Sequence, residues 1–147
     1  IKFPYLLLLI SGGHSQFLEV RGVNKYKRLG TTIDDALGEA FDKTAKILGI
    51  EFPGGPKIEK YAEKGDKNGF VLPKPILHTS GCNLSFAGLK TAVLHTSKKI
   101  KNKQDKYNLA ASFQYTINEI LKVKSKKAME LFVNNNKKNK ENFTDQT

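Results

Sequence analysis

The chain has 147 residues and a hydrophobic share of 39%, enough for one domain or a substantial part of a larger one. Its formal net charge of +11 favours polyanionic partners such as RNA, although lysines that merely solvate a surface explain that charge at least as well. A single cysteine, Cys82, excludes an internal disulfide framework and is typical of a reducing, cytoplasmic location.

The longest apolar run of the chain covers residues 3–10. It is far too short to span a bilayer, and no signal-peptide cleavage site follows it, so it predicts a strand buried on both faces and no membrane partner. Two shorter, more exposed strands are predicted over residues 16–20 and 26–29, with glycine- or asparagine-containing turns between the three. Because the chain begins on Ile1 rather than Met, we expect residues upstream to be missing.

Apolar residues at helical spacing predict four helices in the rest of the chain, over residues 34–48, 57–64, 89–100 and 107–132. Thr32 or Asp34 is expected to cap the first helix, and residues 66–82 are expected to be irregular. Residues 133–147 are polar and rich in Asn and Lys, which predicts a disordered tail. Residues 1–132 would then form the folded part of the chain.

The turn after the first predicted strand reads Ser11-Gly12-Gly13-His14. A glycine pair lets the backbone approach a ligand closely and can turn its N–H groups toward an anion. The serine hydroxyl and the imidazole would add polar groups to such a site. An ordinary hairpin turn explains the same residues.

An acidic pattern follows at the start of the first predicted helix. Asp35, Glu39 and Asp42 fall at i, i+4 and i+7, which places three carboxylates on one helix face. Gly38 costs about 1 kcal/mol against Ala inside a helix, which indicates close approach of another group. A solvated acidic face paired with neighbouring lysines is an equally good interpretation.

A rigid corner separates the first two predicted helices, because Gly54 and Gly55 lie between Pro53 and Pro56. A corner without side chains suits a flat ring that lies against backbone, and Glu59 follows one turn later, where it could accept from ribose hydroxyls. A loop without a ligand is the alternative.

A fourth motif covers residues 83–91 and predicts a strand that runs into a helix through Gly88, with Lys90 in the first turn. It is not a Walker A loop, because the glycine-rich lead-in is missing. The three histidines are scattered without ligand spacing, so the chain offers no metal constellation of its own.

Taken in order, the four motifs resemble the tRNA adenosine threonylcarbamoyltransferase family (TsaD/Gcp-like), formerly called O-sialoglycoprotein endopeptidases. They read Ser-Gly-Gly-His, Ile-Asp-Asp-Ala-x-Gly-Glu-Ala-Phe-Asp-Lys-Thr-Ala-Lys, Pro-Gly-Gly-Pro and Ser-Phe-x-Gly-Leu-Lys-Thr. The resemblance covers residues 3–132. It implies an α/β fold of the actin/sugar-kinase/heat-shock-ATPase (ASKHA) type, with residues 1–132 mainly at the start of its second half. It also implies transfer of a threonylcarbamoyl group from threonylcarbamoyl-AMP to the adenosine beside the tRNA anticodon.

The resemblance further implies a set of substrate-binding residues and no catalytic side chain. Asp42 would hold ribose hydroxyls, Gly55 would lie against the adenine, and Glu59 would be a second ribose contact. The phosphate and the threonylcarbamoyl group would be lined by Leu9, Ile10, Ser11, Gly12 and Gly13.

Other family features lie outside these residues. The family's iron or zinc is held by an H-x-x-x-H pair upstream and an Asp near the C-terminus, and its later Gly-Gly-Val segment would follow Phe132. Its bacterial members act with a silent paralogue and a small ATPase, through contacts that depend largely on the first half. Within the motifs, Asn83 and Ala87 replace the more usual Asp and Ser, and Ser15 replaces Thr. We therefore expect an incomplete fragment that is inactive in isolation.

Two alternatives remain at this stage. A non-catalytic or pseudogene-like remnant that binds RNA would show salt-sensitive RNA binding that survives the loss of Asp42 and Gly55. A sugar- or acetate-kinase-type enzyme of the same fold would phosphorylate a small metabolite without tRNA.

Overall fold

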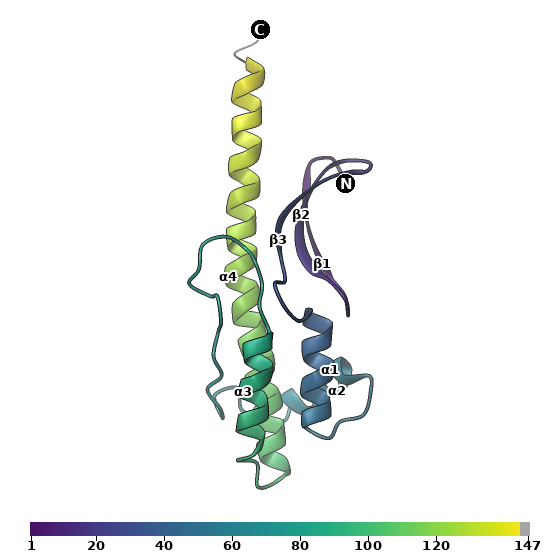
Figure 1. The fold of residues 1–147 in the computed structure, drawn as a ribbon, viewed down its shortest axis with the longest axis vertical. Coiled ribbons are helices and arrows are strands. Elements are labelled where there is room, and N and C mark those ends of the chain that lie inside the picture. The colour runs from purple at the N-terminus through teal and green to yellow at the C-terminus, as the bar shows by residue number, and fades with distance from the viewer. Residues whose placement is uncertain (145–147) are drawn as a thin grey trace.

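The computed structural model describes residues 1–144, and within them the chain forms an antiparallel three-stranded sheet and four helices (Figure 1). The strands are β1 (Tyr5–Ile10), β2 (Ser15–Gly22) and β3 (Lys25–Thr31), in the order β1-β2-β3. The three predicted strands are confirmed.

The predicted burial of the strands is wrong in one respect. β2 is the central strand and the most buried of the three, with Phe17, Glu19 and Val20 inside, whereas β1 is half-buried and its last residues, Leu9 and Ile10, are exposed. An apolar run does not reveal whether its strand lies at the centre or the edge of a sheet, and edge position here decides the burial.

The helices are α1 (Leu37–Ile47), α2 (Gly54–Ala62), α3 (Ala87–Ser97) and α4 (Lys103–Thr144). All four predicted helices are confirmed, with shifted ends. No helix within residues 1–144 is long and apolar enough to cross a membrane, since even the long α4 is rich in Lys and Asn.

The C-terminal part of α4 differs from the predicted disordered tail, because the helix continues to Thr144. The Nδ2 groups of Asn135 and Asn136 donate to the carboxylate of Glu19 on β2, at 3.3 and 3.5 Å. Glu19 is fully buried and also pairs with Arg21 at 3.2 Å. The asparagines therefore satisfy a buried carboxylate, a role that their composition does not suggest. Residues 145–147 of the predicted tail lie outside the described part of the chain.

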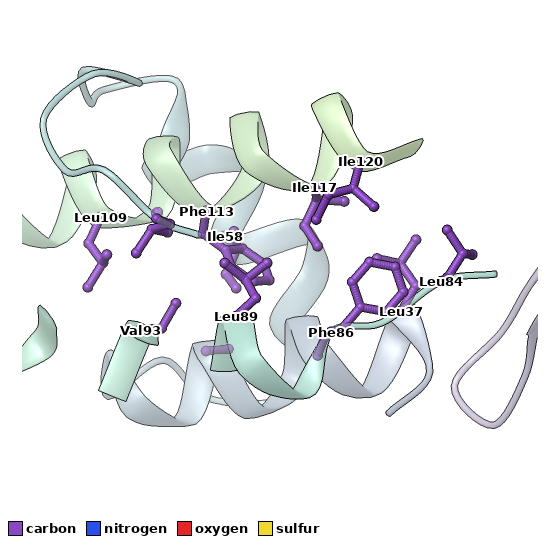
Figure 2. Packing of buried hydrophobic residues seen from close by; sticks show 14 of the residues in the cluster. Leu37, Ile58, Leu84, Phe86, Leu89, Val93, Leu109, Phe113, Ile117 and Ile120 are labelled. Atoms are coloured by element: carbon purple, nitrogen blue, oxygen red, sulfur yellow. The ribbon is translucent and has the colours of Figure 1, made fainter. Parts of the chain in front are cut away.

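The hydrophobic core lies between α4 and the three shorter helices (Figure 2). Phe113 of α4 makes an edge-to-face contact with Phe41 of α1, with ring centroids 5.0 Å apart. Further along α4, Ile117 and Ile120 are fully buried, as are Leu84 and Phe86 of the segment that leads into α3. α4 thus serves as the spine on which the other helices pack.

The irregular segment between α2 and α3 is held against α4 by a buried lysine. Lys124 is fully buried, and its Nζ donates to the Thr79 carbonyl and hydroxyl, both at 3.1 Å, and to the Gly81 carbonyl at 3.2 Å. Desolvation, together with the positive charge of Lys127, lowers the pKa of Lys124 below its ordinary value. Lys127 also donates to the Thr79 carbonyl.

We expect Lys124→Ala to lower the free energy of unfolding by about 2–3 kcal/mol, because it opens a cavity and leaves buried acceptors unpaired. Chemical denaturation measures this directly. Lys122→Ala removes an exposed lysine from the same helix and should change stability by no more than about 0.5 kcal/mol. Equal stability of the two variants would contradict the anchoring role of Lys124.

Candidate functional site

An open hollow of ≈ 530 Å³ lies where the β1–β2 turn, α1, α2 and α4 meet. We call it the α1–α2 hollow. Its walls are mostly apolar, with two carboxylates and one amide among them, and its lining residues are Ile10, Gly12, Leu37, Gly38, Phe41, Asp42, Phe52, Pro53, Gly55, Pro56, Glu59 and Gln114. A largely apolar cavity with a few convergent polar groups is the usual form of a small-molecule site.

The structure brings most of the expected substrate contacts together here, although they come from four different segments. Ile10, Gly12, Asp42, Gly55 and Glu59 line the hollow. The other three expected contacts lie in the same strand and turn but do not line it: Leu9, Ser11 and Gly13.

Seven lining residues were not among the expected contacts, and three of these add side chains suited to holding a ligand. Phe41 and Phe52 supply aromatic surface, and Gln114 supplies an amide from the N-terminal third of α4. Gln114 follows the buried Phe113 within an amphipathic helix, and no motif marks it. In the sequence, the only indication that Gln114 could line a site was its position next to the apolar stripe of a predicted helix.

The Ser11–His14 turn is closed by its own serine. Ser11 Oγ accepts from the backbone N–H groups of Gly13 at 3.3 Å and His14 at 2.8 Å. Two N–H groups that could have faced an anion are therefore satisfied within the turn. The N–H of Gly12 makes no hydrogen bond with a described residue, and Gly12 is the part of the turn that reaches the hollow.

Close backbone approach explains the glycine at the start of α1. A Cβ placed on Gly38 would lie 2.9 Å from Gly12 Cα and 3.0 Å from the Ser11 carbonyl oxygen. The expectation that something approaches Gly38 closely is confirmed, and the neighbour is the backbone of the β1–β2 turn. This contact places the turn at the edge of the hollow.

The glycine pair at the start of α2 has two separate roles. A Cβ on Gly54 would lie 2.6 Å from Ala45 Cβ, so α2 can begin against α1 only because this residue has no side chain. Asp42 Oδ1 accepts from the Gly54 N–H at 3.3 Å, while Oδ2 takes no hydrogen bond from a described residue. A Cβ on Gly55 would meet nothing within 4 Å, and its backbone faces the hollow.

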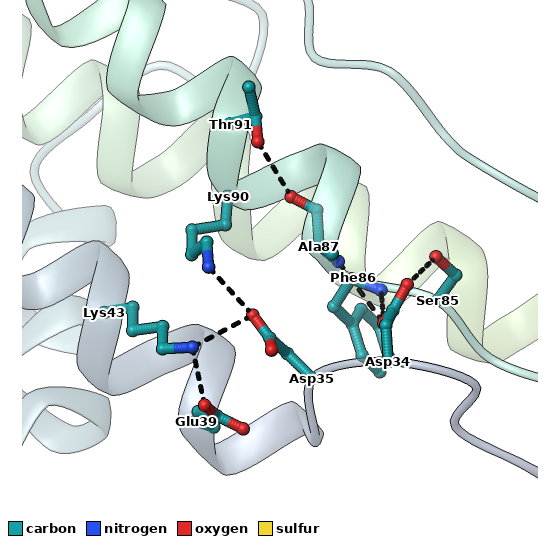
Figure 3. Close-up of polar contacts among 9 residues, drawn as sticks. All are labelled: Asp34, Asp35, Glu39, Lys43, Ser85, Phe86, Ala87, Lys90 and Thr91. Atoms are coloured by element: carbon teal, nitrogen blue, oxygen red, sulfur yellow. Dashed lines mark hydrogen bonds and ion pairs between the residues drawn. The ribbon is translucent and has the colours of Figure 1, made fainter.

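The three carboxylates expected on one helix face do not form one site, and Figure 3 shows two of them, Asp35 and Glu39, paired with lysines. Asp35 lies before α1 and pairs with Lys43 and Lys90, both at 3.2 Å. Glu39 pairs with Lys43 at 2.5 Å, whereas Asp42 turns away to α2 and the hollow. The interpretation as an ion-paired surface therefore describes Asp35 and Glu39, and only Asp42 remains for ligand binding.

The ion pairs around Asp35 shift two pKa values. Burial alone would raise the pKa of Asp35, but the hydrogen bonds and charges of Lys90 and Lys43 outweigh it and hold that pKa below the ordinary value of 3.8. Hydrogen bonds to Glu39 and Asp35 raise the pKa of Lys43 well above its usual range. Lys90 connects α3 to Asp35 just before α1, whereas the Lys43–Glu39 pair lies within α1.

Asp34 caps α3 and not α1, so the predicted cap is wrong. Its Oδ1 accepts from the backbone N–H groups of Phe86 at 2.8 Å and Ala87 at 3.3 Å, and Ser85 Oγ donates to its Oδ2 (Figure 3). The α1 N-terminus is satisfied instead by Ser15, whose Oγ accepts from the Leu37 N–H at 3.0 Å. Both partners are distant in sequence, which local capping rules cannot anticipate.

The fourth motif joins the end of β3 rather than forming a strand of its own. Leu84 makes an isolated parallel bridge with Thr32, and Asn83 Oδ1 accepts from the Thr31 N–H at 3.0 Å. The segment then enters α3, where Lys90 reaches Asp35. This motif therefore fixes α3 to the sheet and to α1.

No group of three or more His, Cys, Asp or Glu residues comes together within the described residues to hold a metal ion. The described residues therefore do not fit a resident iron or zinc.

Comparison with known proteins gives a consistent result. A family model described as tRNA N6-adenosine threonylcarbamoyltransferase matches residues 1–142. Proteins of that name are 71% identical over 143 residues in Pelagibacter ubique (strain HTCC1062), 55% over 134 in Rickettsia massiliae (strain Mtu5) and 53% over 149 in Orientia tsutsugamushi (strain Boryong). These matches cover 97%, 90% and 97% of this chain, but only 40%, 39% and 43% of the relatives. The chain thus spans about 40% of the length of the relatives it matches.

The two neighbouring glycines of α2 should respond differently to one added methyl group. We expect Gly54→Ala to lower the free energy of unfolding by about 1–3 kcal/mol, because the new Cβ overlaps Ala45. Gly55→Ala should stay within about 0.5 kcal/mol of the original chain. Urea denaturation of both variants is the measurement, and equal destabilisation would contradict this division of roles.

The lowered pKa of Asp35 predicts a pH dependence of stability. Its ion pairs stabilise the fold fully above pH 3.8, and that contribution is lost as pH falls through the still lower folded-state pKa. Asp35→Asn should be less stable than the original chain at neutral pH, and the difference should shrink on acidification. Thermal unfolding followed from pH 7 to pH 3 tests this, because other carboxylates contribute equally to both proteins. A difference that is constant with pH would refute it.

Proposed function

The chain belongs to the tRNA N6-adenosine threonylcarbamoyltransferase family, and we propose that its α1–α2 hollow binds the AMP part of threonylcarbamoyl-AMP in such an enzyme. In the proposed reaction the N6 amine of a tRNA adenosine attacks the carbamoyl carbon. A new N–C bond forms at N6, the mixed-anhydride bond to the phosphate breaks, the amine loses a proton, and AMP leaves.

The single observation that carries the proposal is the pairing of two carboxylates with an open backbone surface in one hollow. Asp42 comes from α1 and Glu59 from α2, and Gly55 presents backbone without a side chain at the start of α2. Carboxylates accept strongly from a vicinal diol, and a flat base can lie against glycine backbone and the nearby rings of Phe41 and Phe52. This matches the chemistry of a nucleoside.

The β1–β2 turn supports a place for the phosphate and the acyl group. Gly12 reaches the hollow with a free N–H, next to the N-terminus of α1 at Leu37 and Gly38. A backbone donor and the positive end of a helix both favour negative charge. In the transition state the same donor would stabilise charge that develops on the carbamoyl oxygen.

The remaining features of the complete enzyme are proposed on family grounds. The chain would occupy the start of the second half of an ASKHA-type fold, in the cytoplasm. The ligands of a bound iron or zinc would lie outside these residues. The silent paralogue and the small ATPase would act as partners there.

A chimera tests the proposed function most directly. The matched segment of the Pelagibacter ubique relative is replaced by the corresponding residues of this chain, which are 71% identical and so differ at 29% of the matched positions. We expect the chimera to form N6-threonylcarbamoyladenosine in tRNA, measured by mass spectrometry of digested tRNA. A chimera that folds but transfers nothing would overturn the proposal.

Asp42→Asn should weaken AMP binding to the chain about 10- to 100-fold, because hydrogen bonds to a charged group contribute about 1.5–3 kcal/mol. The amide oxygen can still accept from Gly54, so the fold should be retained. Isothermal titration calorimetry with AMP measures the affinity. Glu39→Gln removes a carboxylate of the same helix that does not line the hollow, and it should leave the affinity unchanged. Equal affinities for all three proteins would reject the ribose assignment.

A further inference from the structure

The connection between α3 and α4 carries a concentration of lysines that nucleotide binding does not explain. Five of the nine residues from 98 to 106 are lysine, and we call this stretch the basic turn: Lys98, Lys99, Lys101, Lys103 and Lys106. The first four are exposed and the fifth is half-buried. In Figure 1 the turn lies at the opposite end of the molecule from the projecting C-terminal part of α4.

The positive charge of the basic turn is not neutralised within the described part of the chain. Its one carboxylate, Asp105, accepts from the Lys101 backbone N–H at 3.0 Å. None of its five lysines makes an ion pair with a described residue. Lys43 and Lys90 behave differently, since both are paired with Asp35. The basic turn is therefore free to meet an external anion.

The C-terminal end of α2 extends this basic surface. Lys64 Nζ lies 5.5 Å from the centre of the Tyr107 ring, and Lys103 Nζ lies 5.8 Å from it. The Lys64 carbonyl accepts from Gln104 Nε2 at 3.0 Å, which holds the end of α2 against the start of α4. Lysines from two elements thus converge around one tyrosine.

Helix stability does not account for these lysines. Lys103 and Lys106 lie in the first turn of α4, where positive charge opposes the helix dipole. Only Lys98 and Lys99, just beyond the C-terminus of α3, are favourably placed with respect to a dipole. The positive charges at the start of α4 are unfavourable for the helix, which indicates that they have a role other than stabilising the fold.

The chemistry of the surface favours a nucleic acid over a membrane or an apolar protein partner. Residues 98–106 and 60–64 contain no exposed large hydrophobic side chain, so nothing here would insert into lipid or fill an apolar groove. Exposed lysines around an aromatic ring suit a phosphate backbone with an accessible base or sugar.

We propose that the basic turn binds the sugar–phosphate backbone of the tRNA substrate, on the strand that flanks the acceptor adenosine. This inference rests on the proposed function. α4 connects the α1–α2 hollow to the basic turn. Gln114 of this helix lines the hollow, and Lys106 lies eight residues earlier, about 12 Å along the helix axis. An RNA strand that presents its adenosine to the hollow reaches the basic turn within a few nucleotides.

The experiment measures binding of a fluorescent anticodon stem–loop RNA to the 147-residue chain between about 50 and 200 mM salt. The test variant combines Lys98→Gln, Lys99→Gln, Lys101→Gln and Lys103→Gln. We expect at least tenfold weaker binding at the low-salt end. The slope of log affinity against log salt should become shallower by about 3, because each lost phosphate contact removes about 0.7–0.9 from it.

A matched control removes the same charge from exposed lysines on other surfaces, through Lys25→Gln, Lys27→Gln, Lys122→Gln and Lys126→Gln. It should change the slope by less than about 1. Equal effects of the two variants, no RNA binding by the original chain, or a preference for anionic lipid vesicles over RNA would each overturn the inference.

Failure of this inference is distinguishable from failure of the proposed function. The test variant should bind AMP as tightly as the original chain, because none of its four substitutions lines the hollow. If Asp42→Asn does not weaken AMP binding, the nucleotide site is rejected. That result does not bear on the salt dependence of RNA binding, which tests the basic turn separately. An unchanged slope with intact AMP binding would reject only the RNA surface.

Discussion

Close backbone contact with α1 is the constraint on which the candidate site depends. Gly38 lets the β1–β2 turn lie against the start of this helix, and Gly54 lets α2 begin against its middle. A side chain at either position would separate the walls of the hollow. Phe41, packed edge-to-face on Phe113, fixes the same helix to α4. The hollow is therefore a consequence of how three segments, the β1–β2 turn, α2 and α4, pack on one helix.

Polar contacts between residues that are far apart in the sequence hold the helices in this arrangement. Asp34 caps α3 from a position just before α1, and Asp35 receives Lys90 from α3. On the opposite side, Lys124 holds the irregular segment before α3 against α4. Residues that look like ligand-binding groups in the sequence, such as Asp35 and Lys90, therefore serve to orient helices. Asp42 is the exception, because one of its oxygens remains available.

Local patterns predicted the secondary structure well, because strands and helices depend on the spacing of nearby apolar residues. What depends on distant partners was not predictable. The edge position of β1, the capping of α3 by Asp34 and the helical state of residues 134–144 all require knowledge of contacts across the fold.

The same limit applies to the site. Family motifs marked Gly12, Asp42 and Gly55, and the structure places all three in one hollow. Gln114 was missed because it lies within a helix that carries no motif. The hydrogen bonds that close the Ser11 turn were also not foreseen, and they leave the Gly12 N–H as the donor of this turn that has no hydrogen-bond partner among the described residues.

A crystal structure of the chain with bound AMP would show directly whether the α1–α2 hollow holds the nucleotide. We expect the adenine against the Gly55 backbone, with ribose hydroxyls within hydrogen-bond distance of Asp42 Oδ2 and Glu59. The lysine-lined groove between α1 and α3, formed by residues such as Lys46, Lys90 and Leu94, is the most obvious rival for an anionic ligand. AMP found in that groove, with the α1–α2 hollow empty, would contradict the account.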